Sequence, residues 1–218
     1  MTKDKIIETV LCEKIIVIVR GVEKNKLLPL AQAMYDGGIR LMEITYCSDG
    51  KTSDEETAEN IKMLTDKFGD KMIIGAGTVL NENQVKLTYK AGGQFIVSPD
   101  TNMDVIERTN KLGMVSVPGA LTPTEIQQAH LIGADFVKLF PVTTLGTDYV
   151  KLVSTPLSHI NLLAVGGIEE DNIKEYLKAG ASGFCIGGRI ADKKLLEENN
   201  YDEITKRSKT FTDLIKSI

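Results

Sequence analysis

The chain has 218 residues, a formal net charge of -4, 42% hydrophobic residues and 26% charged residues, an ordinary composition for a soluble globular protein. No apolar run approaches the roughly 20 residues of a membrane-spanning helix, and neither a signal peptide nor a disulfide framework is indicated. Mild acidity and few aromatic residues argue against a nucleic-acid surface, so we expect a cytoplasmic enzyme or small-ligand protein that binds neither membranes nor nucleic acids.

Short apolar runs recur along the whole chain and alternate with longer segments of helical periodicity. The runs are rich in Val and Ile and nearly continuous in apolar character, which is typical of parallel strands buried on both faces. We expect eight strands, at residues 14–20, 39–44, 72–76, 94–97, 114–117, 135–139, 161–165 and 183–186.

Capping signals predict helices between these strands. Ser53 with Glu56 has the pattern of a capping box, Asn81 precedes a second helix, and Thr122-Pro123 opens a third. Glycines stand where helices should end, just before the next strand, at positions 37–38, 92–93, 113, 133 and 180.

Eight βα units without a linker or a shift in composition predict a single (β/α)8 TIM barrel over residues 1–218. The alternative is a doubly wound open sheet, which usually carries a G-x-G-x-x-G turn after its first strand. The segment Arg20-Gly21-Val22-Glu23 lacks that spacing. The barrel is therefore favoured.

Two ionisable residues, Glu43 and Lys138, fall inside otherwise apolar predicted strands. Burying such groups is costly unless they are paired, neutralised or used. A lysine in a water-poor pocket has a lowered pKa and becomes nucleophilic, and a nearby carboxylate could move protons for it. In the structural alternative, Lys138 extends from the rim and Glu43 forms an ion pair. Because both residues fall at predicted strand ends, the catalytic interpretation is favoured over the structural one.

Glycine pairs follow the last two predicted strands, at Gly166-Gly167 and Gly187-Gly188. Loops at these places in TIM barrels commonly bind phosphate with backbone N–H groups, and Arg189 could add a charged contact. The alternative is that the glycines only permit tight turns. The presence of both pairs predicts a phosphate or similar anion.

No metal site is expected, because the two histidines, His130 and His159, fall away from the strand ends and the cysteines lack C-x-x-C spacing. The sequence also lacks Walker, G-x-S-x-G and H-E-x-x-H motifs.

Three blocks, at residues 37–45, 75–79 and 136–141, resemble the 2-keto-3-deoxy-6-phosphogluconate (KDPG) and 4-hydroxy-2-oxoglutarate (KHG) aldolase family. Residues 118–119, 166–168 and 186–188 are similar to further blocks of that family, in the same order. The resemblance implies a class I aldolase on a barrel, a homotrimer without a metal or organic cofactor, acting on a keto acid that is phosphorylated.

By the same resemblance, Lys138 would form a Schiff base with the keto carbon and Glu43 would be the general acid and base. Thr78 would hold the carboxylate of the pyruvate unit. The remaining implied roles are lining of the site by Pro118 and Gly119, and phosphate binding by Gly166, Gly167 and Gly188.

The chain departs from the family pattern at three places. Cys47 stands where phosphogluconate-cleaving members carry an arginine that helps to bind the carboxylate, Arg189 replaces a small residue, and Val165 replaces a threonine. We expect Arg20, at the end of the first strand, to bind the carboxylate instead.

Two other functions remain open from the sequence alone. A phosphosugar isomerase or epimerase would share the glycine loops, but Glu43 has no evident carboxylate partner at another strand end. A non-catalytic barrel that binds a phosphate ligand would explain the missing arginine.

Overall fold

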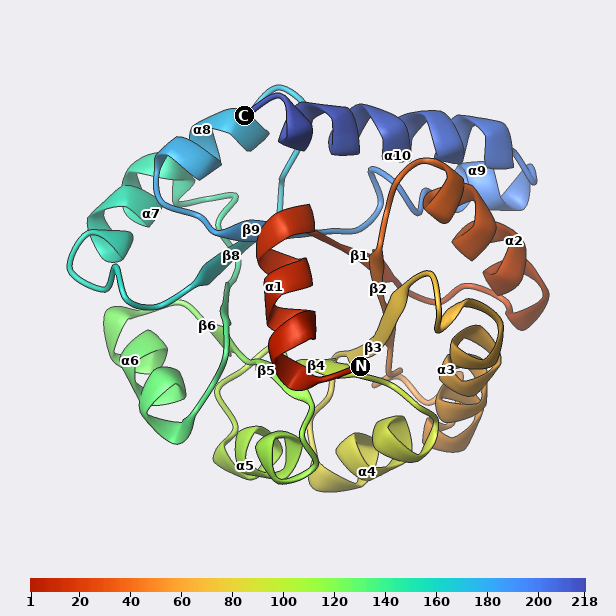
Figure 1. Cartoon of the computed structure of the whole chain (residues 1–218), viewed down its shortest axis with the longest axis horizontal. Helices are drawn as coiled ribbons and strands as arrows, with labels where there is room; N and C mark the ends of the chain where they lie inside the picture. Colours follow the sequence, from red (N-terminus) through yellow and green to blue (C-terminus); the bar gives the residue numbers. More distant parts are fainter.

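The computed structural model describes residues 1–218 and confirms the α/β barrel. Nine parallel strands form one sheet in the order β5-β4-β3-β2-β1-β9-β8-β7-β6, with helices in a ring outside it (Figure 1). The strands are β1 Ile15–Val19, β2 Leu41–Thr45, β3 Ile73–Gly77, β4 Phe95–Val97, β5 Val115–Val117, β6 Gly119–Ala120, β7 Val137–Leu139, β8 Leu162–Val165 and β9 Gly183–Ile186.

The helices alternate with the strands as the capping signals predict. Their bounds are α1 Lys3–Glu13, α2 Lys24–Asp36, α3 Asp54–Phe68, α4 Glu82–Lys90, α5 Met103–Lys111, α6 Pro123–Ile132, α7 Gly146–Ser154, α8 Ile173–Lys178, α9 Lys193–Glu197 and α10 Tyr201–Lys216. Ser53 and Thr122 both form complete capping boxes, and Asn81 caps α4 through its side chain. No helix combines the length and the apolarity that crossing a membrane requires.

The strand expected at 114–117 continues as two short strands separated by Pro118. Proline has no N–H to donate and so interrupts the ladder. β5 pairs with β4 on one side, whereas β6 pairs with β7 on the other. The backbone N–H of Lys138 donates to the carbonyl of Pro118 at 2.8 Å. One stretch of chain thus supplies both edges of the sheet and nearly closes the barrel.

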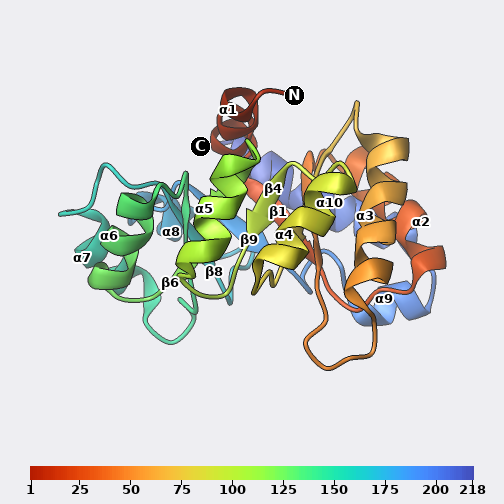
Figure 2. The same ribbon diagram turned by 90° about the horizontal axis from the view of Figure 1, so that it is seen from below.

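The helix α1 was not predicted from the sequence. Its buried residues Ile6 and Val10 belong to the same apolar cluster as the side chains that fill the barrel interior, among them Phe95, Phe136 and Leu163. Lys3 forms an ion pair of 2.9 Å with Asp135, which ties the start of α1 to the barrel. Figure 2 shows α1 at one end of the molecule and the long connections after the strands at the other. The N-terminal end of the barrel is therefore closed.

Candidate active site

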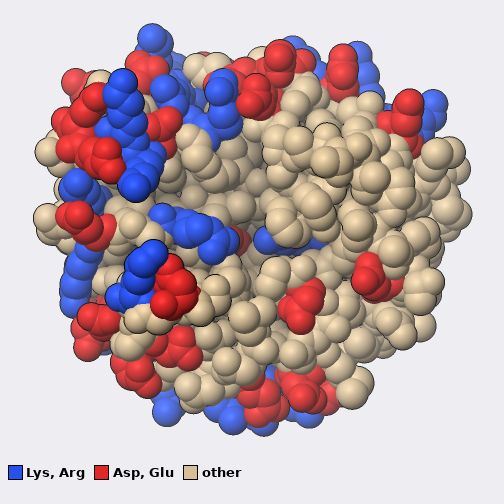
Figure 3. Space-filling model, turned by 180° about the vertical axis from the view of Figure 1, so that it is seen from behind, with Lys and Arg blue, Asp and Glu red and all other residues tan.

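The predicted catalytic residues, Lys138 and Glu43, belong to strands of the barrel, whose C-terminal ends lie on the face opposite α1. Lys138 is the middle residue of β7 and Glu43 the middle residue of β2. Their exposed fractions are 7% and 1%, so both are charged groups removed from most of the solvent. In the view of this face, cationic side chains lie at its hollowed centre (Figure 3).

Glu43 is a buried carboxyl group close to two cations. Burial raises its pKa from 4.5 to about 7, although the charges of Lys138 and Arg20 oppose the shift. One carboxylate oxygen, Oε2, is buried without a hydrogen-bond partner. A side chain at Gly77 on the adjacent strand β3 would collide with the Glu43 carboxylate, so the glycine makes room for it. The result is an acid that exists in both protonation states near neutral pH.

Lys138 is held by its neighbours in the barrel wall. The ring of Phe140 lies under its ammonium, with Nζ 4.8 Å from the ring centroid. Cys185 on β9 is fully buried nearby, and burial followed by the charge of Glu43 raises the pKa of its thiol, while Lys138 opposes the shift. The thiol therefore stays protonated and lines the site as an uncharged group. Lys138 is thus the buried amine of this site.

Arg20 and Thr78 meet beside these residues. Arg20 Nη2 donates to Thr78 Oγ1 at 3.0 Å, and the Arg20 charge reaches Glu43. Thr78 has a φ of 55°, an unusual left-handed conformation for a threonine and one that is often kept at functional sites. Cys47 lies in the β2–α3 connection, where its thiol donates to Asp49 at 2.6 Å. Among the residues around Glu43, Arg20 is thus the guanidinium available for a carboxylate.

A cavity of about 270 Å³ extends from Phe140 to the glycine turns after β8 and β9. Gly166 and Gly167 have φ values of 101° and 65°, and side chains there would also press on Thr143 in the β7–α7 connection. Gly188 faces open space. These turns therefore leave their backbone uncovered.

Arg189 and Glu169 are the charged residues in the wall of the same cavity. Arg189 is not a free cation, because its Nη2 lies 2.6 Å from Glu170 Oε2.

Pro118 and Gly119 lie behind Lys138 in the barrel wall. Pro118 accepts from the Lys138 backbone, and Gly119 pairs with Lys138 in the β6–β7 register. A Cβ at Gly119 would meet the carbonyl of Pro99. The structure therefore gives these two residues a part in positioning Lys138.

Phe140, Gly77 and Thr143 were not assigned roles from the sequence. Phe140 follows Lys138 by two residues, so its position on the same face of an extended segment was a usable signal. The roles of Gly77 and Thr143 depend on contacts between distant segments, which sequence spacing does not reveal.

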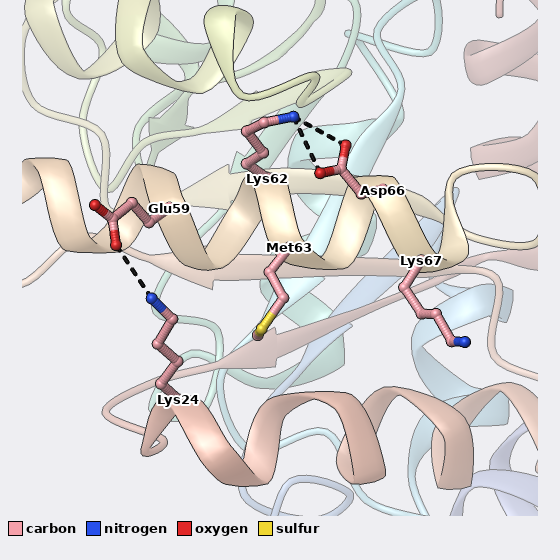
Figure 4. A pocket seen from close by; sticks show the side chains of 6 residues that line it. All are labelled: Lys24, Glu59, Lys62, Met63, Asp66 and Lys67. Carbon is pink, nitrogen blue, oxygen red and sulfur yellow. Dashed lines mark hydrogen bonds and ion pairs between the residues drawn. The ribbon is translucent and has the colours of Figure 1, made fainter.

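A groove on the outer wall offers an alternative location for a site. It runs between α2 and α3 and is lined by Lys24, Glu59, Lys62, Met63, Asp66 and Lys67 (Figure 4). Lys24 pairs with Glu59, and Lys62 pairs with Asp66, both on the molecular surface. These charged side chains stay in water, where their pairs are weak, whereas Lys138 and Glu43 are buried, so the strand ends remain the candidate site.

Metal-binding groups are not gathered anywhere in the fold. No cluster of three or more His, Cys, Asp or Glu side chains is placed to hold an ion. His130 in the last turn of α6 and His159 before β8 contact each other, with ring centroids 5.0 Å apart.

Comparison with known proteins identifies the family that carries this arrangement. The family model described as "KDPG and KHG aldolase" matches residues 6–207. The 2-dehydro-3-deoxy-6-phosphogalactonate aldolase of Escherichia coli strain K12 is 35% identical over 81% of this chain and 83% of its own length. The 2-dehydro-3-deoxy-phosphogluconate aldolase of Haemophilus influenzae is 32% identical over 99% of both chains.

A solved relative has the same fold. The KDPG aldolase of Legionella pneumophila, with pyruvate captured at low pH as a covalent carbinolamine intermediate, is 25% identical and has a TM-score of 0.83. The alignment covers 93% of this chain and 96% of that one.

Proposed function

Because the chain belongs to the KDPG and KHG aldolase family, it is a carbon–carbon lyase, and we propose that it cleaves a phosphorylated 2-keto-3-deoxy sugar acid to pyruvate and an aldehyde. The observation that carries the proposal is that Lys138 and Glu43 are both buried in barrel strands and lie close enough for the Lys138 charge to act on the Glu43 carboxyl group. The carbinolamine captured in the Legionella pneumophila relative supports a covalent route.

Lys138 is the nucleophile of the proposed reaction. Its neutral amine adds to the C2 keto carbon of the substrate, and the resulting carbinolamine loses water to give a protonated imine. That imine withdraws electrons from C3, so the C3–C4 bond breaks and its electron pair enters an enamine. Protonation at C3 and hydrolysis of the imine then release pyruvate and restore the lysine.

Glu43 moves the protons that these steps require. As a carboxylate it accepts the proton of the C4 hydroxyl through a bound water as the aldehyde forms, and as an acid it assists the loss of water from the carbinolamine. Its pKa of about 7 suits both tasks, because each form is populated near neutral pH.

Arg20 and Thr78 bind the C1 carboxylate. A guanidinium pairs with a carboxylate strongly because both are charged and their geometries match. Arg20 donates to Thr78 Oγ1 and its charge reaches Glu43, and this proximity of both groups to Glu43 supports the assignment.

The cavity beyond Phe140 receives the far end of the substrate. Backbone N–H groups of the turns at Gly166–Gly167 and Gly188, with Arg189, are the donors for its phosphate. Two relatives act on phosphorylated acids that differ by name in the sugar, galactonate and gluconate, so both compounds are the substrates to test first.

The test is trapping with pyruvate and sodium borohydride, followed by peptide mass spectrometry. We expect a reduced pyruvate adduct on Lys138, and pyruvate release from one or both phosphorylated acids in a coupled assay. Lys138→Arg is the matched variant, since it keeps the positive charge but lacks an amine that forms an imine; it should lose both the adduct and at least 1,000-fold (about 4 kcal/mol) of activity. An adduct on another lysine would refute the assignment.

We further propose that residues 1–218 form one aldolase domain that assembles as a homotrimer in the cytoplasm. The half of the catalytic face over α6 and α7 carries few charged side chains (Figure 3). Leu131 on α6 and Leu152 on α7 are each 74% exposed. Such apolar side chains on neighbouring helices favour burial against further copies of the chain.

A further inference from the structure

The one guanidinium at the far end of the substrate cavity is already occupied in the free protein. Arg189 Nη2 lies 2.6 Å from Glu170 Oε2, and its Nη1 lies 4.0 Å from Glu169 Oε1. Two carboxylates thus face one cation at the place where the proposed substrate brings a phosphate. The local charge is negative before any ligand binds.

A second guanidinium near this end is also committed to carboxylates. Arg207 is the neighbouring guanidinium, and it contacts Asp192 at 3.2 Å and Glu203 at 3.4 Å. The following helix α8 has only six residues, so its dipole offers little compensation. Within the cavity wall, the glycine backbone and a share of Arg189 are therefore the groups that can receive the phosphate.

The Glu170–Arg189 contact is mutual and leaves Glu170 ionised. Partial burial alone would raise the pKa of Glu170, but the hydrogen bond and charge of Arg189, with a backbone hydrogen bond and the charge of Arg207, outweigh it and the net pKa is lowered. The same hydrogen bond raises the pKa of Arg189. Glu170 therefore carries its full negative charge whenever the phosphate arrives.

We propose that Glu170 is an internal competitor of the substrate's phosphate: it holds Arg189 as a counter-ion in the free enzyme and thereby limits the preference for phosphorylated over unphosphorylated substrates. The proposal rests on the proposed aldolase function. It makes Glu170 a specificity-determining residue, although it need not touch the reacting carbons. Its expected effect follows from the exposure of the pair: an exposed ion pair contributes up to about 1 kcal/mol, which corresponds to roughly fivefold in affinity.

The substitution that tests this is Glu170→Gln, which keeps the size and hydrogen-bonding capacity of the side chain and removes its charge. The readout is the ratio of kcat/KM for 2-keto-3-deoxy-6-phosphogluconate to kcat/KM for unphosphorylated 2-keto-3-deoxygluconate. We expect this ratio to rise about fivefold, mainly through KM of the phosphorylated substrate. Glu107→Gln is the control, because Glu107 pairs with Lys111 at 3.0 Å on the distant helix α5 and should leave the ratio unchanged.

A second variant shows whether the effect passes through Arg189. Arg189→Gln should lower the ratio, and adding Glu170→Gln in that background should have no further effect. A ratio that stays constant or falls in Glu170→Gln overturns the proposal, since Glu170 would then be inert or would position Arg189 for the phosphate. A full Glu170→Gln effect without Arg189 overturns it as well.

Calorimetric binding of inorganic phosphate provides a readout that needs no turnover. We expect the dissociation constant to fall about fivefold in Glu170→Gln and not in Glu107→Gln. The borohydride trapping above tests the aldolase function separately: an adduct on Lys138 with unchanged phosphate binding refutes only the role of Glu170, whereas tightened phosphate binding without an adduct refutes only the aldolase.

Discussion

The burial of Glu43 affects both the proposed proton transfer and the folding stability of this protein. Its side chain is 1% exposed, and one of its oxygens has no hydrogen-bond partner. A carboxyl group in that position resists ionisation, which is a disadvantage for folding and an advantage for proton transfer. Two predictions separate these consequences.

Glu43→Gln should lower kcat by about 100- to 10,000-fold, the usual contribution of a general acid or base. Pyruvate binding should change much less, because Lys138, Arg20 and Thr78 remain. Steady-state kinetics together with pyruvate titration measure the two effects. Equal loss of turnover and of pyruvate binding would instead assign Glu43 to maintaining the site's structure.

The pH dependence of stability should also report on Glu43. Its pKa is 4.5 ordinarily and about 7 in the fold, so between these values the unfolded chain gives up a proton that the folded chain keeps. Stability from this group is therefore complete below pH 4.5 and declines as the pH rises, by about 3 kcal/mol at pH 8. The test is urea unfolding of wild type and Glu43→Gln at pH 4.5 and pH 8. The free energy of unfolding of the variant, relative to that of the wild type, should be about 3 kcal/mol higher at pH 8 than at pH 4.5. Glu8→Gln, at an exposed glutamate of α1, should show no such change.

At the scale of elements, local signals predicted most of the barrel. Every strand except β6, together with the caps at Ser53, Asn81 and Thr122, follows from periodicity and capping chemistry within a few neighbouring residues. The break at Pro118 was not predicted, because it depends on the strand having different partners on its two sides. The helix α1 was missed because its burial depends on the far end of the barrel.

The features of the site likewise divide into those that a single segment of sequence predicts and those that depend on contacts between distant segments. Lys138 and Glu43 were predicted because a charge inside an apolar run is visible in one segment. The clearance that Gly77 gives to Glu43 and the ion pair between Glu170 and Arg189 both join distant segments. Such contacts arise only when the barrel brings strand ends together.

The capping box of α6 gives a prediction for an element. Thr122 accepts from the Glu125 N–H and Glu125 accepts from the Thr122 N–H at 2.8 Å, which satisfies two otherwise unpaired donors. Thr122→Ala should lower the free energy of unfolding by about 1 kcal/mol. Thr124→Ala, at an exposed residue in the same first turn, is the control and should cost well under half of that. Equal losses in urea unfolding would show that the box adds nothing.

For the whole molecule, the proposed trimer should have three times the chain mass of 23.9 kDa, about 72 kDa by light scattering. Substituting both Leu131 and Leu152 with Glu should convert it to a monomer, because charges in an apolar interface lose their water. Tyr89→Glu on α4 introduces one charge at a half-exposed aromatic residue and should leave the trimer intact. A 72 kDa species that persists in the double variant would place the interface elsewhere.

The closed end of the barrel also limits where substrate and products can enter and leave during the proposed reaction. Because α1 and the apolar interior close one end, the substrate, both products and the water of hydrolysis must all pass through the other end, at the C-terminal ends of the strands. The proposed nucleophile, Lys138, is 7% exposed in this barrel, so pyruvate bonded to it would be held away from most of the solvent. In the proposed reaction pyruvate stays bonded to Lys138 until the imine is hydrolysed, so the aldehyde is released before pyruvate, and the reverse synthesis begins with pyruvate.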